Sequence, residues 1–409
     1  MAKRLSMTMR PRRVRILVLA SHPIQYQAPL FRALAARPEI DLEVAFYSRN
    51  GLEKRLDPQF GVEVAWDIPL IEGYRHRFLK NIGISKDPGS FWRLNPQVVP
   101  LCLSKKFDAV WIHGWASASN WLAWLSAIAS SKRMLVRGES NGLQERSGWK
   151  GAVKRVVLKA YLSRMAAVLT IGSLNRKFYE AYGVPSEKLF HTPYATDNSF
   201  FFAQADQHLP HKLDLRRRYN IEANLPVVLY AGKLIENKRP FDLLTAFQRL
   251  QRRLPCSLAL VGDGALRPRL QQLASEQGIP NVHFLGFRNQ SEIGQFYALA
   301  DVFVLPSSSE PWGLVLNEAL CFGLPAVVSD QVGGALDLIE PGGNGYRFPC
   351  GDIESLAFHL EQILGSEERR MKMGAMSRRR IRAWGVEQSV EGIIEALFQG
   401  ARFRKCAAV

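Results

Sequence analysis

The stretch ADVFVLPSSSEPWGLVLNEALCFGLPAVVSD, residues Ala300–Asp330, joins two short apolar runs through a turn and a helix-like segment. The runs DVFVLP and PAVVS are continuously apolar, which is typical of parallel strands covered by helices on both faces. Glu310 lies in the turn and Glu318 in the helix-like segment, with seven residues between them. The stretch therefore predicts a strand–helix–strand unit with one carboxylate after its first strand and a second one within the helix.

The same alternation of strand-like and helix-like segments fills most of the chain in two series, which the polar stretch Asp197–Pro226 separates. Two such series predict an α/β protein with two doubly wound, Rossmann-like domains that face a central cleft. The predicted domains are residues 1–200 and 201–385, and residues 386–409 are expected to form a helix that packs back toward the first domain. The expected strands are Val14–Ala20, Leu42–Ser48, Phe107–His113, Arg133–Arg137 and Ala166–Ile171 in the first series, and Val227–Gly232, Ser257–Gly262, Val282–Gly286, Asp301–Pro306 and Pro325–Ser329 in the second.

The composition of the 409 residues, 47% hydrophobic and 22% charged, is typical of a globular protein and argues against wholesale disorder. No apolar run reaches the roughly 20 residues that span a bilayer, and the N-terminus lacks the pattern of a secretory signal. The five cysteines are scattered without a C-x-x-C pair, which indicates reduced thiols and no structural zinc site. We therefore expect a cytoplasmic protein.

The formal net charge of +17 suits nucleic acid, an anionic lipid surface or a phosphorylated small molecule. A solvated basic surface is the simplest alternative. The sequence shows no interleaving of aromatic and basic residues and no recognition module, which argues against nucleic acid. Charge alone does not choose between the remaining partners, so the choice depends on the motifs.

The loops after the first two strands of the second series predict a diphosphate site. Lys233 and Lys238 follow the first strand, and Gly262 and Gly264 follow the second. Because the carboxyl ends of parallel strands lie at one edge of a sheet, these loops should meet in one crevice. The ammonium groups would offset phosphate charge, the glycines would permit close approach, and the helix that starts near Gly313 would add free amide donors. Each feature alone has an ordinary structural explanation, but together they favour an anion site.

In such a site Glu310 and Glu318 would bind neutral groups and not phosphates, because two like unit charges about 4 Å apart repel by roughly 4 kcal/mol near a protein surface. A nucleotide sugar offers hydroxyl groups on both sides of its diphosphate. The two carboxylates could accept hydrogen bonds from the sugar on one side and from the ribose on the other. The structural alternative is a helix N-terminal acid at Glu310 and an ordinary helix residue at Glu318.

Five segments between Val227 and Asp352 carry a resemblance to a known family: YAGKLIENKRPFDLL, LVGDGALRPRL, VHFLG, the stretch quoted first and GGNGYRFPCGD. In this order they resemble the C-terminal half of glycosyltransferase family 4, the retaining, nucleotide-sugar-dependent enzymes of the GT-B fold. The resemblance implies that the first domain binds the acceptor and the second the nucleotide sugar. It also implies that Glu310 contacts sugar hydroxyls, that Glu318 binds the ribose and that two lysines stabilise the leaving diphosphate, although many members have Arg where Lys233 stands. The implied donor-binding residues are Gly232, Lys233, Lys238, Gly262, Gly264, Phe287, Arg288, Glu310, Trp312, Gly313, Leu314 and Glu318.

The first domain is less typical of that family. Its first strand is followed by SHPIQYQAPLFRALA, Ser21–Ala35, where many members have a Gly-Gly loop. The turn LVRGES, Leu135–Ser140, has no histidine where the family often has a catalytic one, and His113 lies one strand earlier. A core histidine and a structural ion pair are the ordinary alternatives. By position, the catalytic candidates are His113 and Glu139 together with Glu310, Lys233 and Lys238, and the acceptor-side candidates are His22, Gln25, Tyr26 and Arg137.

The sequence favours transfer without a metal ion. It contains no D-x-D pair, the usual carboxylate arrangement for a metal on a nucleotide diphosphate; the nearest pattern, at Asp41 and Glu43, lies inside a predicted strand. The lysines and the helix terminus can offset the leaving charge instead. We therefore expect no cofactor besides the nucleotide sugar co-substrate.

The leading hypothesis is a hexosyltransferase-type glycosyltransferase that moves a sugar from a nucleotide diphosphate sugar to a hydroxyl of a sugar, lipid-linked or polysaccharide acceptor. Such a reaction would belong to the biosynthesis of cell-surface polysaccharide or glycolipid. The alternatives are another GT-B enzyme that acts on a nucleotide sugar, such as an epimerase, and, from a different class, a basic nucleic-acid-binding protein.

The segment Trp149–Leu169 places basic residues beside apolar ones at helical spacing, which is typical of an interfacial helix. The alternative is a helix packed on the sheet with its lysines in water. Each basic residue near an anionic surface contributes on the order of 1 kcal/mol, so we expect peripheral association with the inner face of the membrane. The residues concerned are Lys150, Lys154, Arg155, Lys159 and Arg164, with Lys3, Arg4, Arg10, Arg12 and Arg13 at the N-terminus.

Overall fold

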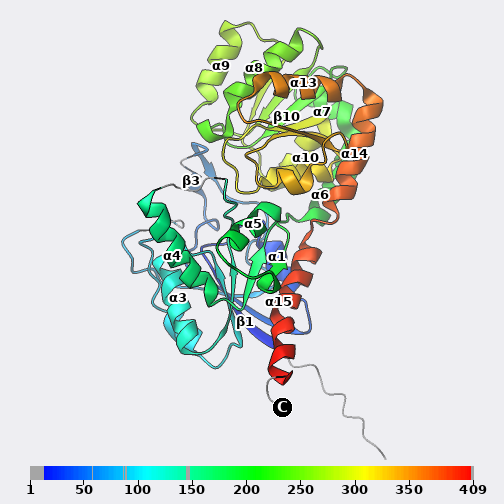
Figure 1. The fold of residues 1–409 in the computed structure, drawn as a ribbon. Helices are drawn as coiled ribbons and strands as arrows, with labels where there is room; N and C mark the ends of the chain where they lie inside the picture. Colours follow the sequence, from blue (N-terminus) through cyan, green and yellow to red (C-terminus); the bar gives the residue numbers. More distant parts are fainter. Residues whose placement is uncertain (1–12, 58, 86, 88–89, 144–147, 407–409) are drawn as a thin grey trace, which may run out of the picture.

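The computed structural model describes residues 13–406 except 58, 86, 88–89 and 144–147, with side chains up to residue 399. These residues form two lobes, one above the other in Figure 1. The lower lobe is coloured blue to green and the upper one green to orange, and the red C-terminal helix runs down along the lower lobe. The basic residues Lys3, Arg4, Arg10 and Arg12 lie outside the described residues.

The first lobe contains a seven-stranded parallel sheet with strand order β5-β2-β1-β6-β7-β8-β9. Alternate residues of the central strand enter different cores: Ile16 and Val18 pack under α1 and α15, and Leu17 and Leu19 pack under α2 to α5. This burial on both faces explains why the strands are apolar without alternation. The elements of this lobe are β1 (Val14–Ala20), β2 (Ile40–Phe46), β5 (Arg75–Phe78), β6 (Ala109–His113), β7 (Arg133–Arg137), β8 (Ala167–Thr170), β9 (Leu189–His191), α1 (Ala28–Ala35), α2 (Val98–Leu103), α3 (Ala118–Ala129), α4 (Trp149–Ser163), α5 (Ser173–Ala181) and α15 (Val386–Cys406).

The second lobe contains a six-stranded parallel sheet with strand order β12-β11-β10-β13-β14-β15. Its two faces are again separate cores, one under α8, α9 and α13 and the other under α6, α7, α10, α11 and α12. The elements are β10 (Val227–Ala231), β11 (Ser257–Val261), β12 (Val282–Gly286), β13 (Val302–Leu305), β14 (Ala326–Ser329), β15 (Gly345–Phe348), α6 (Asn198–His208), α7 (Lys212–Arg218), α8 (Pro240–Gln251), α9 (Arg267–Glu276), α10 (Gln290–Leu299), α11 (Leu314–Cys321), α12 (Ala335–Leu338), α13 (Ile353–Leu364) and α14 (Glu367–Ile381).

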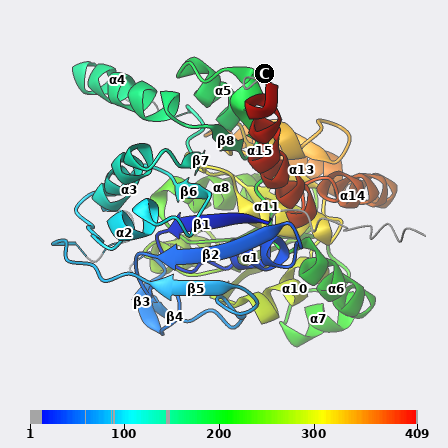
Figure 2. The same cartoon turned by 90° about the horizontal axis from the view of Figure 1, so that it is seen from below.

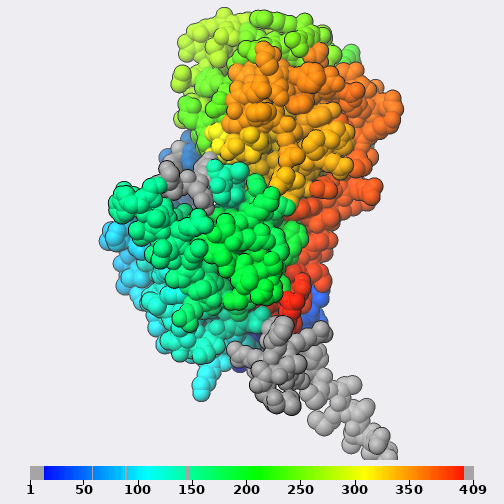
Figure 3. Space-filling model, viewed as in Figure 1, coloured from blue at the N-terminus to red at the C-terminus, as the bar shows by residue number. Residues whose placement is uncertain are grey.

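The chain passes between the lobes twice. The polar stretch after β9 forms α6 and α7, which pack on the second lobe through buried residues such as Phe201 and Leu215. After α14 the chain returns, and α15 lies on α1, β8 and β9 of the first lobe. Gly392 permits this contact, because a Cβ atom there would lie 1.9 Å from the carbonyl oxygen of His191. Figure 3 shows the two lobes joined on the side where this orange and red segment runs.

A small antiparallel hairpin, β3 (Arg55–Asp57) with β4 (Val62–Val64), extends from the first lobe to the second (Figure 1). The hairpin and the residues just after it are hydrogen-bonded to that lobe: Asn289 Nδ2 donates to the carbonyl oxygen of Ala65 at 2.6 Å, the amide of Ser291 donates to Asp67 at 3.2 Å, and Lys233 Nζ lies 3.1 Å from Asp57 Oδ2. The hairpin therefore bridges the cleft between the sheets.

In the part of the chain that the structure describes, no helix is both long enough and apolar enough to cross a bilayer.

Candidate functional site

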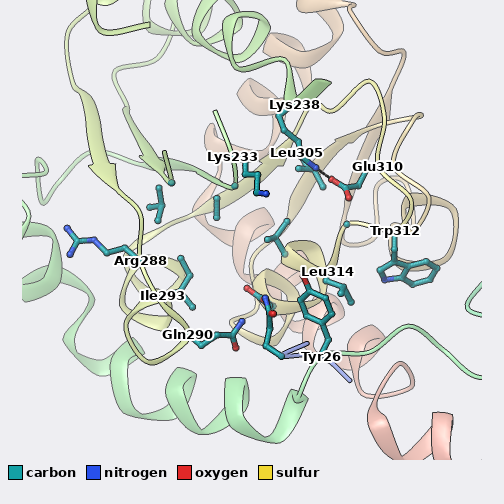
Figure 4. A pocket seen from close by; sticks show the side chains of 18 of the residues that line it. Tyr26, Lys233, Lys238, Arg288, Gln290, Ile293, Leu305, Glu310, Trp312 and Leu314 are labelled. Atoms are coloured by element: carbon teal, nitrogen blue, oxygen red, sulfur yellow. Dashed lines mark hydrogen bonds and ion pairs between the residues drawn. The ribbon is translucent and has the colours of Figure 1, made fainter. Parts of the chain in front are cut away.

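A cavity of about 370 Å³ lies between the lobes (Figure 4). Its second-lobe wall consists of the loops after β10, β11, β12 and β13 with residues of α10 and α11. Its first-lobe wall consists of the loops after β1, β7 and β9, the β3–β4 hairpin and the segment just after the hairpin. In the second sheet, the strand order reverses between the neighbours β10 and β13. Ligands of open α/β sheets bind at such a switch point, beyond the carboxyl ends of the strands.

Lys238 and Lys233 both follow β10 and both line the cavity. Lys238 forms an ion pair with Glu310, which Figure 4 shows as a dashed line, and the two side chains are each 16% exposed. Lys233 Nζ lies 3.1 Å from Asp57 Oδ2 and donates to Gln59 Oε1 at 2.8 Å. The two ammonium groups are thus held by carboxylates, one from the same lobe and one from the hairpin of the other lobe.

Gly262 and Gly264 allow the loops after β10 and β11 to touch. A Cβ atom at Gly262 would lie 1.9 Å from the carbonyl oxygen of Gly232, and one at Gly264 would lie 2.5 Å from that of Leu234. Both glycines also have positive φ angles, +128° and +155°. Gly232 and Gly262 line the cavity, whereas Gly264 lies outside the set of lining residues and acts in loop packing.

Glu318 lies in the first turns of α11 and is 4% exposed. Its Oε2 accepts a hydrogen bond of 2.7 Å from the hydroxyl of Tyr297. Burial raises the pKa of Glu318 to about 7, although hydrogen bonds from Tyr297 and Gln290 act in the opposite direction. A carboxyl group of this kind is suited to hydroxyl partners and is poorly placed beside further negative charge.

The turn before α11 positions the remaining predicted donor residues. Gly313 precedes the helix with φ of +93°, a conformation that favours glycine. Trp312 is 3% exposed and its Nε1 donates to Asn317 Oδ1 at 2.9 Å, so the ring is fixed against the helix. Leu314 and Phe287 line the cavity as well, and Arg288 lines it through its base while its guanidinium points away from the lysines (Figure 4).

On the first-lobe wall, Gln25, Tyr26 and Glu139 line the cavity. Burial raises the pKa of the Tyr26 hydroxyl, so this group stays protonated and can donate a hydrogen bond. Glu139 is exposed and accepts a hydrogen bond of 2.5 Å from the hydroxyl of Tyr194. These three predicted residues of the first lobe therefore share the cavity with the predicted donor residues.

The other candidates of the first lobe lie outside the set of lining residues. Arg137 is buried and donates to the carbonyl oxygens of Thr192 and Pro193, which is a supporting position. Burial lowers the pKa of His22 to about 4 and that of His113 to about 3, so both are neutral at pH 7. His113 stacks on Trp111 with ring centroids 4.7 Å apart, as expected for a core histidine.

The sequence reading missed several residues of the cavity. Asp57 and Phe60 come from the hairpin and Trp66 from the residues just after it, and no local pattern predicts their contacts with the second lobe. Tyr297 and Gln290 lie on α10, and the loop after the VHFLG strand is the signal that could have indicated them. Within the described residues, no group of three or more His, Cys, Asp and Glu side chains is arranged to hold a metal ion.

The two lobes, the parallel sheets and the cleft between them define the GT-B fold. HepE of Anabaena in complex with UDP superposes with a TM-score of 0.73 at 18% identity, over 94% of this chain and all of that one. A sucrose-phosphate synthase from Thermosynechococcus elongatus superposes with a TM-score of 0.69 at 22% identity, over 97% of this chain and all of that one. At these identities the similarity concerns the fold.

In sequence, residues 212–380 match the family model Glycosyl transferases group 1, so the match lies within the second lobe. An N-acetyl-alpha-D-glucosaminyl L-malate synthase of Bacillus anthracis is 32% identical over 40% of this chain and 42% of its own length. A sulfoquinovosyl transferase of Arabidopsis thaliana is 36% identical over 40% of this chain and 31% of its own length. The chain thus aligns with less than half of the length of these relatives.

Proposed function

We propose that this protein is a retaining glycosyltransferase of family 4, which moves a sugar from a nucleotide diphosphate sugar to an acceptor hydroxyl. The observation that carries the proposal is the meeting of Lys233, Lys238, Glu310 and Glu318 in one cavity at the switch point of the second sheet. The UDP complex of HepE and the names of the relatives, which describe sugar transfer, support the same class of reaction.

In this proposal the lysines and the free amides at the start of α11 offset the charge of the leaving diphosphate. Glu310 accepts hydrogen bonds from the transferred sugar and Glu318 from the ribose. No metal ion is required, because two ammonium groups supply the opposing charge. Since both lysines are paired with carboxylates, donor binding must exchange Asp57 for phosphate at Lys233, a change that a small movement of the hairpin would allow.

A panel of UDP-, GDP- and ADP-sugars tests the proposal through the melting temperature. A donor present at 100 times its Kd stabilises the folded state by about 2.7 kcal/mol, which raises the melting temperature measurably. We expect the sugars of one nucleotide to raise the melting temperature. EDTA should change neither this rise nor the turnover. A panel without any shift would contradict the donor assignment, and loss of turnover in EDTA would contradict the metal-free reaction.

We also propose that α4 binds an anionic membrane surface, where a lipid-linked acceptor would be found. The helix projects from the first lobe in Figure 2, and only Leu158, Tyr161 and Leu162 are buried along it. Its exposed apolar residues stand beside exposed basic ones: Trp149, Val153, Val156 and Val157 with Lys150, Lys154, Arg155 and Lys159. An apolar strip with basic neighbours is the composition of an interfacial helix.

Co-sedimentation with liposomes tests the membrane proposal. We expect binding to vesicles that contain 30% phosphatidylserine at low salt, release at high salt, and loss of binding in Val153→Asp/Val156→Asp. Binding by that variant equal to the wild type, or no binding to anionic vesicles at low salt, would contradict it.

A further inference from the structure

A second cavity of about 370 Å³ adjoins the first one on the side of α4. Glu139, Glu310 and Pro311 line both cavities, so the segment around Pro311 separates them and the carboxylate of Glu139 stands at their junction. We propose that this second cavity binds the terminal sugar of an acceptor that carries an apolar chain. The inference rests on the proposed function, because it names the acceptor side of the same reaction.

One wall of the second cavity is aromatic. Trp115 and Phe178 line it with their rings parallel to within 9° and their centroids 6.2 Å apart. The indole is fixed against backbone, since a Cβ atom at Gly138 would lie 2.8 Å from its ring. Rigid aromatic faces with a few polar groups around them are typical of binding sites for small molecules, and the C–H face of a sugar fits such a wall.

The facing groups are polar and mostly neutral. They are the side chains of Asn141, Ser140, Ser309 and Gln331, with the carboxylate of Glu139. Asn141 Nδ2 lies 3.2 Å from the carbonyl oxygen of Pro311 and 3.4 Å from that of Glu310, so it links the first lobe to the separating segment. Amide, hydroxyl and carboxylate groups suit the hydroxyls of a sugar, in contrast to the lysine pair of the first cavity.

Glu139, at the junction of the two cavities, would orient the acceptor. Glu139 already accepts a hydrogen bond from Tyr194 and is exposed, so its second oxygen is available to a hydroxyl that enters from the second cavity. Such a hydroxyl would approach Glu310, which the proposed function places at the transferred sugar. Glu139 would therefore hold the reacting hydroxyl of the acceptor toward the donor.

The other end of the second cavity reaches α4, because Lys154 is among its lining residues. The exposed Val153 and Val157 lie one residue before and three residues after Lys154 on the same helix. A sugar in the cavity would therefore place an attached apolar chain on the apolar strip of α4, and Lys154 could pair with an anionic group between them. The two features together specify an amphiphilic acceptor.

Saturation-transfer NMR with octyl β-glucoside and octyl β-galactoside, below their micelle concentrations, tests the site. Ala116 is exposed and lines only the second cavity, so Ala116→Trp fills this cavity from outside the core. Ala36, exposed at the end of α1, gives the matched control Ala36→Trp. We expect saturation of sugar-ring protons with the wild type and the control, at least a fivefold loss with Ala116→Trp, and no displacement of the glycoside by UDP.

Three outcomes would overturn the assignment: no sugar-ring saturation from the wild type with either glycoside, equal saturation from Ala116→Trp, or displacement of the glycoside by UDP. The rise in melting temperature with the nucleotide that acts on the wild type is measured on each variant to show that the first cavity is intact. If no nucleotide of the panel has an effect even on the wild type, the proposed function fails, while the glycoside experiment still decides whether the second cavity binds sugar.

Discussion

Lys233 and Lys238, on one wall of the cleft, stand on loops locked by glycines at the end of a buried parallel sheet. Asp57, on the opposite wall, stands on a two-stranded hairpin, and its side chain is 30% exposed. The wall that bears the lysines is therefore rigid at these loops, whereas the hairpin of the first-lobe wall is mostly exposed and supplies a counter-charge. The comparison indicates that ligand binding should change the first-lobe wall, because its contact with Lys233 is the one that a phosphate can replace.

Removal of a lysine from the rigid wall should have the largest effect. We expect Lys238→Ala to lower kcat/KM for the donor by a factor on the order of 10² to 10³, the loss typical of a missing group that stabilises developing negative charge. Lys372, 76% exposed on α14, provides the matched control Lys372→Ala. Donor kinetics of both variants, with circular dichroism as a check of folding, give the answer, and activity of Lys238→Ala close to the control would contradict the diphosphate site.

The buried carboxyl group of the same wall should make stability depend on pH. The pKa of Glu318 is about 7 in the folded protein against 4.5 for an ordinary Glu, so the folded state binds the proton more tightly. Stability should therefore fall as pH rises from about 4.5 to 7, by up to roughly 3 kcal/mol. Glu318→Gln should remove this fall, as measured by urea unfolding at pH 5 and pH 8. Parallel pH profiles of the wild type and the variant would show that the carboxyl group is not perturbed.

The second lobe could be predicted from sequence to a large extent because its site is local. Each donor residue follows a strand at a fixed spacing, and a parallel sheet brings the ends of its strands together. Eleven of the twelve predicted donor residues line the cavity, and Gly264 is the exception. All ten predicted strands exist with ends shifted by two residues at most, whereas the short strands β3, β4, β5, β9 and β15 were missed.

For the first lobe, the sequence predicted the fold but only a part of the site. Its share of the site depends on contacts across the cleft, such as Asp57 with Lys233 and Asn141 with the carbonyl oxygen of Pro311, which no sequence spacing encodes. Gln25, Tyr26 and Glu139, which were predicted from their positions after strands, line the cavity. His113 was predicted in the same way, but its ring lies against Trp111, because the direction of a side chain at a strand end depends on packing.

A smaller effect is expected at Glu310, the carboxylate that pairs with Lys238 on the second-lobe wall. Glu310→Gln keeps the shape of the side chain but loses the charge that pairs with Lys238 and the strong acceptor for a sugar hydroxyl. We expect a loss of about 10- to 100-fold in kcat/KM with the native sugar, and a smaller loss with the donor that lacks the contacted hydroxyl. Kinetics with the matched deoxy donors measure the difference. An equal loss with both donors would show that Glu310 serves only to hold Lys238.

The smallest effect, and the one that tests the comparison most directly, is expected at the hairpin. Asp57→Asn should strengthen UDP binding by about two- to fivefold, because a partly exposed ion pair contributes at most about 1 kcal/mol and the phosphate no longer competes with a carboxylate for Lys233. The Oδ1 of Asn can still accept the hydrogen bonds that the backbone amides of Gln59 and Phe60 donate to Asp57 Oδ1 at 2.8 and 3.0 Å, so the turn is kept. Asp67→Asn, on the same bridge but bonded to Ser291, is the matched control and should leave the affinity unchanged. Calorimetric titration with UDP at low salt measures all three proteins. Weaker binding by Asp57→Asn would reverse the interpretation, because Asp57 would then hold Lys233 in place for the phosphate and the hairpin would be a fixed part of the donor site.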